Sequence, residues 1–243
     1  MIYLFIFIFS VCIGSFLNVL IYRLPIGEEF VVKRSYCTSC KHELEFYDLI
    51  PIFSYIGLRG KCRYCHCKIS IRYPLIEFLT GLVGVWCYER FGFSTTMCLH
   101  FLVFAILIVI SVIDIKTMEI PDGCNFALIV LGLIRVFMFE LNLYEHIFYA
   151  GLVAFIIWII NRIKLSFGDG DMKLLFSLGL YLGDKVFLVL LFSIFFGSIY
   201  GLYLLIMKKA NKNTIFPFGP FIALGSFVYI FYGRYLIRWL MCL

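Results

Sequence analysis

Residues 97–113 have the sequence MCLHFLVFAILIVISVI, an apolar run that ends directly at Asp114. A helix needs about 20 mostly apolar residues to cross the hydrocarbon core of a membrane, so this run predicts one short transmembrane span. The whole chain is similarly apolar: of its 243 residues, 63% are hydrophobic and only 15% are charged. Soluble domains have roughly 45–50% apolar and about 25% charged residues, so this composition excludes a soluble globule, a disordered chain and a secreted disulfide scaffold.

Seven further apolar runs predict that the chain crosses the membrane about eight times. The eight runs are Ile2–Leu20, Leu75–Tyr88, Met97–Ile113, Cys124–Phe139, Ile147–Ile160, Leu174–Leu182, Val186–Met207 and Phe221–Leu240. The first run has no preceding basic residue and no small-residue cleavage site, so we expect a retained span rather than a signal peptide. Seven spans is the main alternative, because Leu174–Leu182 is short and contains Gly179. The fold class expected is an all-α polytopic membrane protein.

The distribution of basic residues predicts the orientation of these spans, because lysine and arginine concentrate in cytoplasmic loops. The alternate connections 23–72, 114–122, 162–173 and 208–217 hold 16 of the 21 lysines and arginines. We therefore expect these connections to be cytoplasmic and both termini to lie outside.

The longest polar segment, residues 23–73, contains two Cys-x-x-Cys pairs. Cys37 and Cys40 form the first pair, and Cys62 and Cys65 form the second after 21 intervening residues. This pattern is typical of a tetrahedral zinc site, in which a hairpin brings two thiolate pairs to one ion. The metal would give a small cytoplasmic loop domain its fold, and the reducing cytoplasm disfavours disulfides.

Other interpretations of this cysteine cluster remain open. Cys67 or His66 could replace one of the four ligands, and the thiols could instead be reduced structural groups or redox-active pairs.

Two acids lie at the ends of apolar runs, where a charged side chain is costly and suggests a function. Asp114 follows the run that ends at Ile113, and Asp171 lies in the sequence GDGDMK at residues 168–173. The predicted topology places both at the cytoplasmic boundary. Two carboxylates that share one water suit peptide hydrolysis, since like charges separate their pKa values and leave one base and one acid. The alternative is two ordinary interfacial acids at helix ends.

Residues beside the two acids are candidates for supporting roles. Gly168 and Gly170 lack side chains, so the backbone there could approach an extended peptide. Lys116 and Lys173 each follow an acid by two residues and could lower a carboxylate pKa or bind a substrate carbonyl. Anchoring at the cytoplasmic membrane face is the simpler interpretation of both lysines.

Several motifs, in order along nearly the whole chain, resemble the type IV prepilin peptidases (prepilin leader peptidase/N-methyltransferase), which are membrane aspartyl proteases of the GxGD type. These motifs are Gly14–Pro25, the two Cys-x-x-Cys pairs with Leu49–Pro51, Ser54–Tyr55 and Arg59–Cys62 between them, Ile69–Glu77, Asp114 with Pro121, Gly168–Lys173 and Pro217–Pro220. The resemblance implies cleavage of the basic leader of prepilins or pseudopilins after a glycine, at the bacterial inner membrane. It places Asp114 and Asp171 at the catalytic positions and Asp169 at the variable position of GxGD.

The resemblance also implies a second activity, methylation of the new N-terminal residue with S-adenosylmethionine. Glu77 is then a candidate for contact with the methyl donor or the substrate, and zinc has a structural role. The expected division is a first transmembrane helix (1–22), a zinc-binding domain (23–73) and a peptidase core (74–243).

The expected partners are prepilin or pseudopilin substrates and membrane lipid, with no nucleic acid and no assigned oligomeric state. Two other functions would fit parts of the sequence. A membrane thiol–disulfide oxidoreductase would need its cysteine pairs on the oxidising side, contrary to the distribution of basic residues. A non-catalytic scaffold with a zinc loop would not depend on Asp114 or Asp171.

Overall fold

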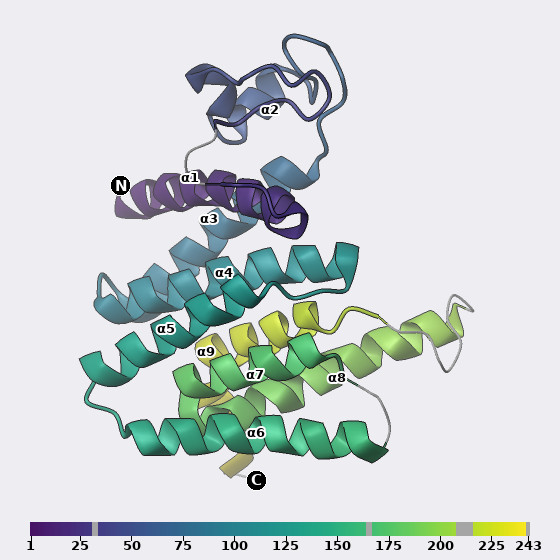
Figure 1. Cartoon of the computed structure of the whole chain (residues 1–243). Helices are drawn as coiled ribbons and strands as arrows, with labels where there is room; N and C mark the ends of the chain where they lie inside the picture. The colour runs from purple at the N-terminus through teal and green to yellow at the C-terminus, as the bar shows by residue number, and fades with distance from the viewer. Residues whose placement is uncertain (31–33, 164–166, 208–215, 242–243) are drawn as a thin grey trace. The chain divides into compact units, whose positions relative to one another are not determined.

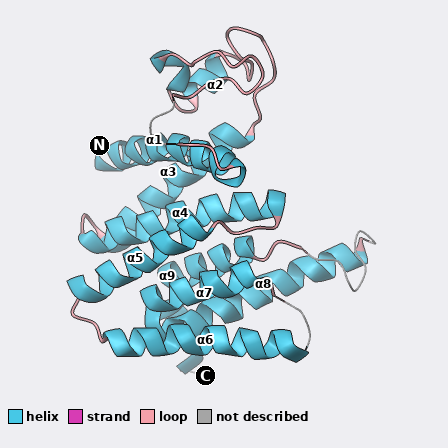
Figure 2. Ribbon diagram, viewed as in Figure 1, coloured by secondary structure: helices cyan, strands magenta, loops and turns pink. Residues whose placement is uncertain are grey.

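The computed structural model describes residues 1–30, 34–163, 167–207 and 216–241, with side chains described as far as residue 233. Its regular structure in these ranges is helical, with isolated β-bridges but no β-strand, as Figure 2 shows. The chain forms two compact units, residues 1–109 and residues 110–243. This division falls within the helix α4 (Thr95–Thr117), and the division predicted from the sequence, at residues 1–22, 23–73 and 74–243, stays a prediction.

The first unit is built on two helices that pack closely, α1 (Ile2–Arg23) and α3 (Arg72–Phe91) (Figure 1). Glycines allow this approach: a Cβ on Gly14 would lie 2.8 Å from the Cα of Glu77, and one on Gly84 would lie 2.0 Å from Ser10 Oγ. Asn18 Nδ2 donates a hydrogen bond of 3.1 Å to the carbonyl of Tyr73 on α3. The Gly-x-x-x-Asn part of the first motif thus joins α1 to α3.

The polar segment between α1 and α3 has little regular structure. It contains the 3-10 helices η1 (Leu24–Ile26) and η2 (Phe46–Leu49) and the short helix α2 (Phe53–Gly57). We describe this segment as the cysteine loop, residues 24–71.

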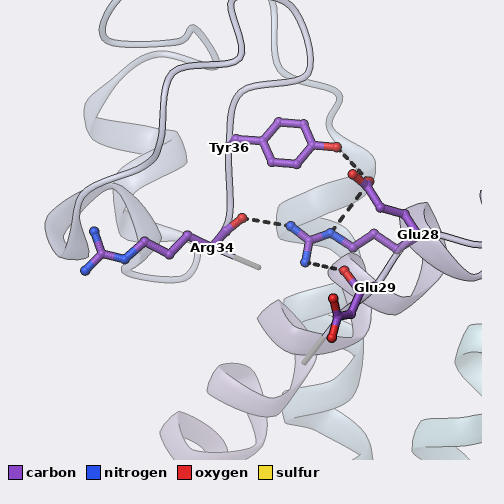
Figure 3. Close-up of polar contacts among 5 residues, drawn as sticks. Glu28, Glu29, Arg34 and Tyr36 are labelled. Carbon is purple, nitrogen blue, oxygen red and sulfur yellow. Dashed lines mark hydrogen bonds and ion pairs between the residues drawn. The ribbon is translucent and has the colours of Figure 1, made fainter. Parts of the chain in front are cut away.

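Arg23 connects the end of α1 to the start of the cysteine loop and is only 3% exposed. Its guanidinium donates to the carbonyls of Glu29 (3.1 Å) and Arg34 (2.8 Å) and lies 3.9 Å from the Glu28 carboxylate. Figure 3 shows that Glu28 also accepts the hydroxyl of Tyr36, at 2.7 Å. This hydrogen bond and burial raise the pKa of Tyr36 to about 12. Arg23 is therefore a buried residue that connects α1 to the cysteine loop, and it is not a solvated basic residue.

The second unit contains the end of α4 and the remaining helices. They are α5 (Asp122–Met138), α6 (Leu143–Ile163), α7 (Asp169–Leu182), the 3-10 turn η3 (Gly183–Lys185), α8 (Val186–Ile206) and α9 (Gly219–Met241). Helix α7 packs against both α5 and α6, and α8 pairs with α9 (Figure 1). At the α6–α7 contact, a Cβ on Gly179 would lie 2.6 Å from the Cα of Ala150, so glycine there allows close packing.

The eight apolar runs lie on helices, except for Phe139 and Met207, which directly follow α5 and α8, and this confirms the helical part of the predicted fold class. Within the described ranges, four helical segments are long and apolar enough to cross a membrane: Ile2–Ile26, Thr95–Thr117, Leu143–Ile163 and Asp169–Ile206. The last of these joins α7 and α8 across Gly183, whose φ of +66° lies in the left-handed region. Gly219–Gly233 is a shorter apolar helix. Eight spans and their orientation stay predictions, and most of the basic connection 208–217 lies outside the described residues.

Candidate active site and metal centre

Asp114 lies in the last turn of α4 and is 4% exposed. The helix ends shortly after it because Met118 adopts a φ of +54°, with its N–H donating to the Asp114 carbonyl. A helix C-terminus disfavours a negative charge, but Asp114 Oδ2 accepts the backbone N–H of Gly219, the first residue of α9, at 2.7 Å. The N-terminus of one helix thus stabilises a carboxylate at the C-terminus of another.

Asp171 is the third residue of α7 and is 8% exposed. Its Oδ2 atom accepts the backbone N–H of Gly168 at 3.1 Å, so the side chain caps its own helix. The N-terminus of α7 favours a negative charge at this position.

The two carboxylates interact electrostatically, since the charge of Asp114 acts on Asp171. Each uses Oδ2 for a glycine N–H, and among the described residues neither Oδ1 has a hydrogen-bond partner. Two acids from distant parts of the sequence therefore come into range of each other, each with one oxygen left for a water or a substrate.

Glycines make this arrangement possible by leaving space. A Cβ on Gly219 would lie 2.8 Å from Asp114 Oδ2, and one on Gly168 would lie 3.3 Å from Asp171 Oδ2. A Cβ on Gly170 would lie 3.1 Å from the Cβ of Ile120, in the connection that follows α4. The glycines of the GxGD sequence thus allow close contact within the protein, in addition to any approach by a substrate.

The two lysines beside the acids lie at the exposed edge of this region. Lys173 Nζ pairs with Asp122 Oδ1 at 2.7 Å, and both side chains are exposed. Lys116 is also exposed. An exposed ion pair of this kind contributes about 0–1 kcal/mol. Lys173 therefore links the start of α7 to the start of α5 rather than neutralising Asp171.

The cysteine loop folds into two similar knuckles. In the first, Cys37 donates its N–H to the carbonyl of His42, and in the second, Cys62 donates to the carbonyl of Cys67, each at 2.9 Å. Lys41 and His66 occupy equivalent positions with φ values of +60° and +56°. The isolated bridges Tyr36–Glu43 and Lys61–Lys68 flank the two turns.

The sulfur atoms of Cys37, Cys40, Cys62 and Cys65 all lie within 4.8 Å of one another. The Cys37–Cys65 separation is 3.9 Å, close to the value of about 3.8 Å that a tetrahedron with Zn–S bonds of about 2.3 Å requires. Four thiolates in this arrangement fit a zinc ion.

Two family models match consecutive parts of the chain. The bacterial peptidase A24 N-terminal domain matches residues 8–91, which include the cysteine loop, and the type IV leader peptidase family matches residues 101–202, which include both acids. A prepilin leader peptidase/N-methyltransferase of Legionella pneumophila is 31% identical over 98% of this chain and 93% of the relative. Proteins with the same name from Aeromonas hydrophila (31% identical, 96% of this chain, 92% of the relative) and Pseudomonas aeruginosa (32%, 93% and 89%) are also similar.

The chain belongs to the type IV leader peptidase family. No solved structure matches it at a significant level.

Within this member of the leader peptidase family, Glu77 has a defined contact. Its Oε2 atom accepts the N–H of Ile52 at 2.8 Å, and Ser15 is a further hydrogen-bonding partner. Ile52 has a φ of +62°, so this contact holds a strained turn of the cysteine loop against α3. Glu77 is 7% exposed, and its carboxylate already accepts a hydrogen bond within the protein.

Sequence reasoning missed the role of Gly219. The motif Pro217–Pro220 stands out in the sequence, but Gly219 donates to Asp114 through its backbone N–H, which depends on α9 starting at this residue. The preceding Phe218 packs edge-to-face on Phe167, with ring centroids 5.2 Å apart, and so joins the α9 start to the residue before Gly168.

Proposed function

We propose that this protein is a membrane aspartyl endopeptidase that removes the basic leader from prepilins or pseudopilins, after a glycine. Membership of the type IV leader peptidase family supports the substrate class. The observation that supports the chemistry is the pair of buried carboxylates, Asp114 and Asp171. Each accepts one backbone N–H, and the second oxygen of each has no hydrogen-bond partner among the described residues.

The mechanism follows from two like charges in one low-dielectric site. Their repulsion favours a state in which one carboxylate is ionised and the other is protonated. The ionised group takes a proton from the water that attacks the scissile carbonyl carbon, while the protonated group donates to the carbonyl oxygen. The first carboxyl group then gives the proton it took from water to the amide nitrogen, and the second takes back its proton from the oxygen of the tetrahedral intermediate. The C–N bond breaks, the new N-terminus is released and both acids return to their starting states.

The test is processing of a prepilin by purified protein in detergent. We expect Asp114→Asn and Asp171→Asn each to abolish cleavage, because an amide cannot act as base or titrating acid. Asp169→Asn is the matched control, since Asp169 belongs to the same motif but is exposed, and it should retain cleavage. Full cleavage by both Asp114→Asn and Asp171→Asn would refute the catalytic assignment.

We also propose that Cys37, Cys40, Cys62 and Cys65 hold one structural zinc ion. The ion would supply no catalytic chemistry; it would hold the two knuckles together in a segment with few buried apolar side chains. Metal analysis of the purified protein should give about one zinc per chain and much less for Cys40→Ser/Cys65→Ser. Equal metal content in both proteins would contradict this proposal.

N-methylation of the mature N-terminus is a further part of the proposal. It is supported by the names of the relatives, which are called N-methyltransferases. S-adenosylmethionine would be the methyl donor. Mass spectrometry of a cleaved prepilin should show one added methyl group only when this donor is present.

We propose a multi-pass protein of the bacterial inner membrane, with the acids and the cysteine loop at the cytoplasmic face and both termini outside. Labelling of Cys37 by an impermeant thiol reagent is the discriminating experiment. Slow labelling in intact cells and rapid labelling after permeabilisation are expected. Rapid labelling of intact cells would reverse the topology and would favour a thiol–disulfide oxidoreductase.

A further inference from the structure

Large apolar side chains are exposed on the part of the cysteine loop that contains η2 and α2. Phe46 is 86% exposed, Phe53 75% and Ile56 65%, and Tyr47 and Ile50 are exposed as well. Phe53 and Ile56 are three residues apart on α2, so they lie on the same side of this short helix. A concentration of exposed apolar side chains marks an interaction surface. We call these five residues the apolar loop residues.

The turn between η2 and α2 lies beside α3, because the N–H of Ile52 donates to Glu77 Oε2 at 2.8 Å. Glu77 lies level with Gly14 of α1, since a Cβ on Gly14 would lie 2.8 Å from the Cα of Glu77. Gly14 precedes Leu20, the end of the first apolar run, by six residues, so it lies about 9 Å inside that end at 1.5 Å per residue. The glutamate side chain spans only part of this distance. The turn therefore reaches the level at which α1 and α3 are already apolar.

Helix α3 has an exposed apolar surface at the same level. Leu75 is 58% exposed and Phe78 is 50% exposed, and these residues precede and follow Glu77 in the sequence. In a membrane such side chains contact lipid, so the lipid around this turn of α3 also reaches the adjacent turn of the cysteine loop.

The rest of the loop is basic. From Phe46 to Arg72 the sequence has five lysines and arginines and one acid, Asp48, which pairs with Arg63 at 2.7 Å. Arg59 and Lys61, which directly follow α2, are exposed. Basic residues next to a membrane attract anionic phospholipid headgroups, and they repel a basic peptide such as the prepilin leader.

We propose that the cysteine loop is anchored in the membrane surface by the apolar loop residues, with Arg59 and Lys61 at anionic phosphate headgroups. Apolar side chains beside basic ones are the usual composition of segments that lie in the membrane interface. Both ends of the loop join helices expected to lie in the membrane, so this contact is intramolecular in effect, whereas a separate protein must first be recruited. The inference rests on the proposed membrane location, and it does not depend on the orientation of the spans or on peptidase activity.

The test uses the full-length protein in phospholipid vesicles, with one added tryptophan as a reporter. Phe53→Trp and Ile56→Trp each place the reporter in the proposed contact. Glu43→Trp is the control, because the Glu43 side chain is 66% exposed in the mostly polar stretch at residues 41–45. The emission of the original protein, which has three tryptophans, is subtracted, and the unfolding midpoint of each variant shows that it is folded.

Brominated phospholipids quench a tryptophan that lies among them. In vesicles of brominated phosphatidylglycerol and phosphatidylcholine, we expect the emission of Phe53→Trp and Ile56→Trp to fall roughly twofold, with little change for Glu43→Trp. Brominated lipid in both leaflets makes this result independent of the direction in which the protein inserts. Equal quenching of all three reporters would overturn the proposal. Blue-shifted emission from Phe53→Trp without quenching by lipid would identify a protein surface as the occupant and would also overturn it.

The role of the anionic headgroups is tested separately. Vesicles of brominated phosphatidylcholine alone should quench Phe53→Trp less than the mixture with phosphatidylglycerol does. The added substitutions Arg59→Gln and Lys61→Gln should remove this difference, because they remove the charges that attract the headgroups. Equal quenching of Phe53→Trp at every phosphatidylglycerol content would overturn the headgroup contact. None of these outcomes affects the cleavage assays or the thiol-labelling experiment, so this inference and the proposed function fail separately.

Discussion

Replacing Gly219 by alanine tests whether its contact with Asp114 sets the geometry of the active site. The added Cβ would lie 2.8 Å from Asp114 Oδ2 and 3.4 Å from its Cγ, so the carboxylate or the start of α9 must move. That movement lengthens the 2.7 Å hydrogen bond from the Gly219 N–H. A hydrogen bond to a charged group contributes about 1.5–3 kcal/mol. Its loss in the transition state would lower kcat/KM roughly 10- to 160-fold.

The assay is cleavage of a prepilin by purified protein at several substrate concentrations, with an unfolding midpoint for each variant. Gly123→Ala is the matched control, because a Cβ at this exposed glycine of α5 would meet no atom within 4 Å. We expect the control to retain full activity. If Gly219→Ala cleaves as fast as the original protein, the contact between α9 and Asp114 has no part in catalysis.

Three further predictions concern other contacts of the structure. Gly170→Ala should lower the free energy of unfolding by about 1 kcal/mol, measured by thermal unfolding, because the added Cβ would lie 3.1 Å from the Cβ of Ile120, which must shift. Metal analysis of Cys67→Ser should still give one zinc per chain. Cys65→Ser should lose only part of its zinc, because Cys67 Sγ lies 3.7 Å from Cys37 Sγ and can replace the missing ligand. Glu77→Gln keeps an acceptor for the N–H of Ile52 and should keep the cysteine loop resistant to proteolysis, whereas Glu77→Leu should not.

Much of the fold could be predicted because apolar length and glycine spacing decide it locally. The run at residues 97–113 is helical within α4, and its end at Asp114 correctly marked the approach to a helix terminus. The same reasoning placed Asp171 at the start of a helix, where an acid caps the free N–H groups. The number of spans was harder to predict, since α7 has only 14 residues and continues through Gly183 into α8.

The partners of the site residues could not be predicted, because most of them are backbone groups. Gly219 lies 105 residues from Asp114 and offers only an N–H, which every residue except proline has. The N–H of Ile52, which donates to Glu77, is likewise a backbone group that the sequence does not mark. For Lys173 the sequence favours anchoring at the membrane face, with an action on the acids as the alternative; in the structure its Nζ pairs with Asp122. Side-chain chemistry can be read from a sequence, whereas the direction of a backbone donor requires the fold.

Helix ends explain why the two acids and the glycines occur together at the proposed hydrolytic site. The first N–H groups of a helix have no partner within it, and inside a membrane each unpaired group is costly. Asp114 satisfies such a donor at the start of α9, and Asp171 satisfies one before α7. A side-chain donor such as lysine would hold each carboxylate with a full charge and would oppose the sharing of one proton. Backbone donors from Gly219 and Gly168 supply only partial charge at close range, so they position each acid and are compatible with the proton exchange that the proposed mechanism requires.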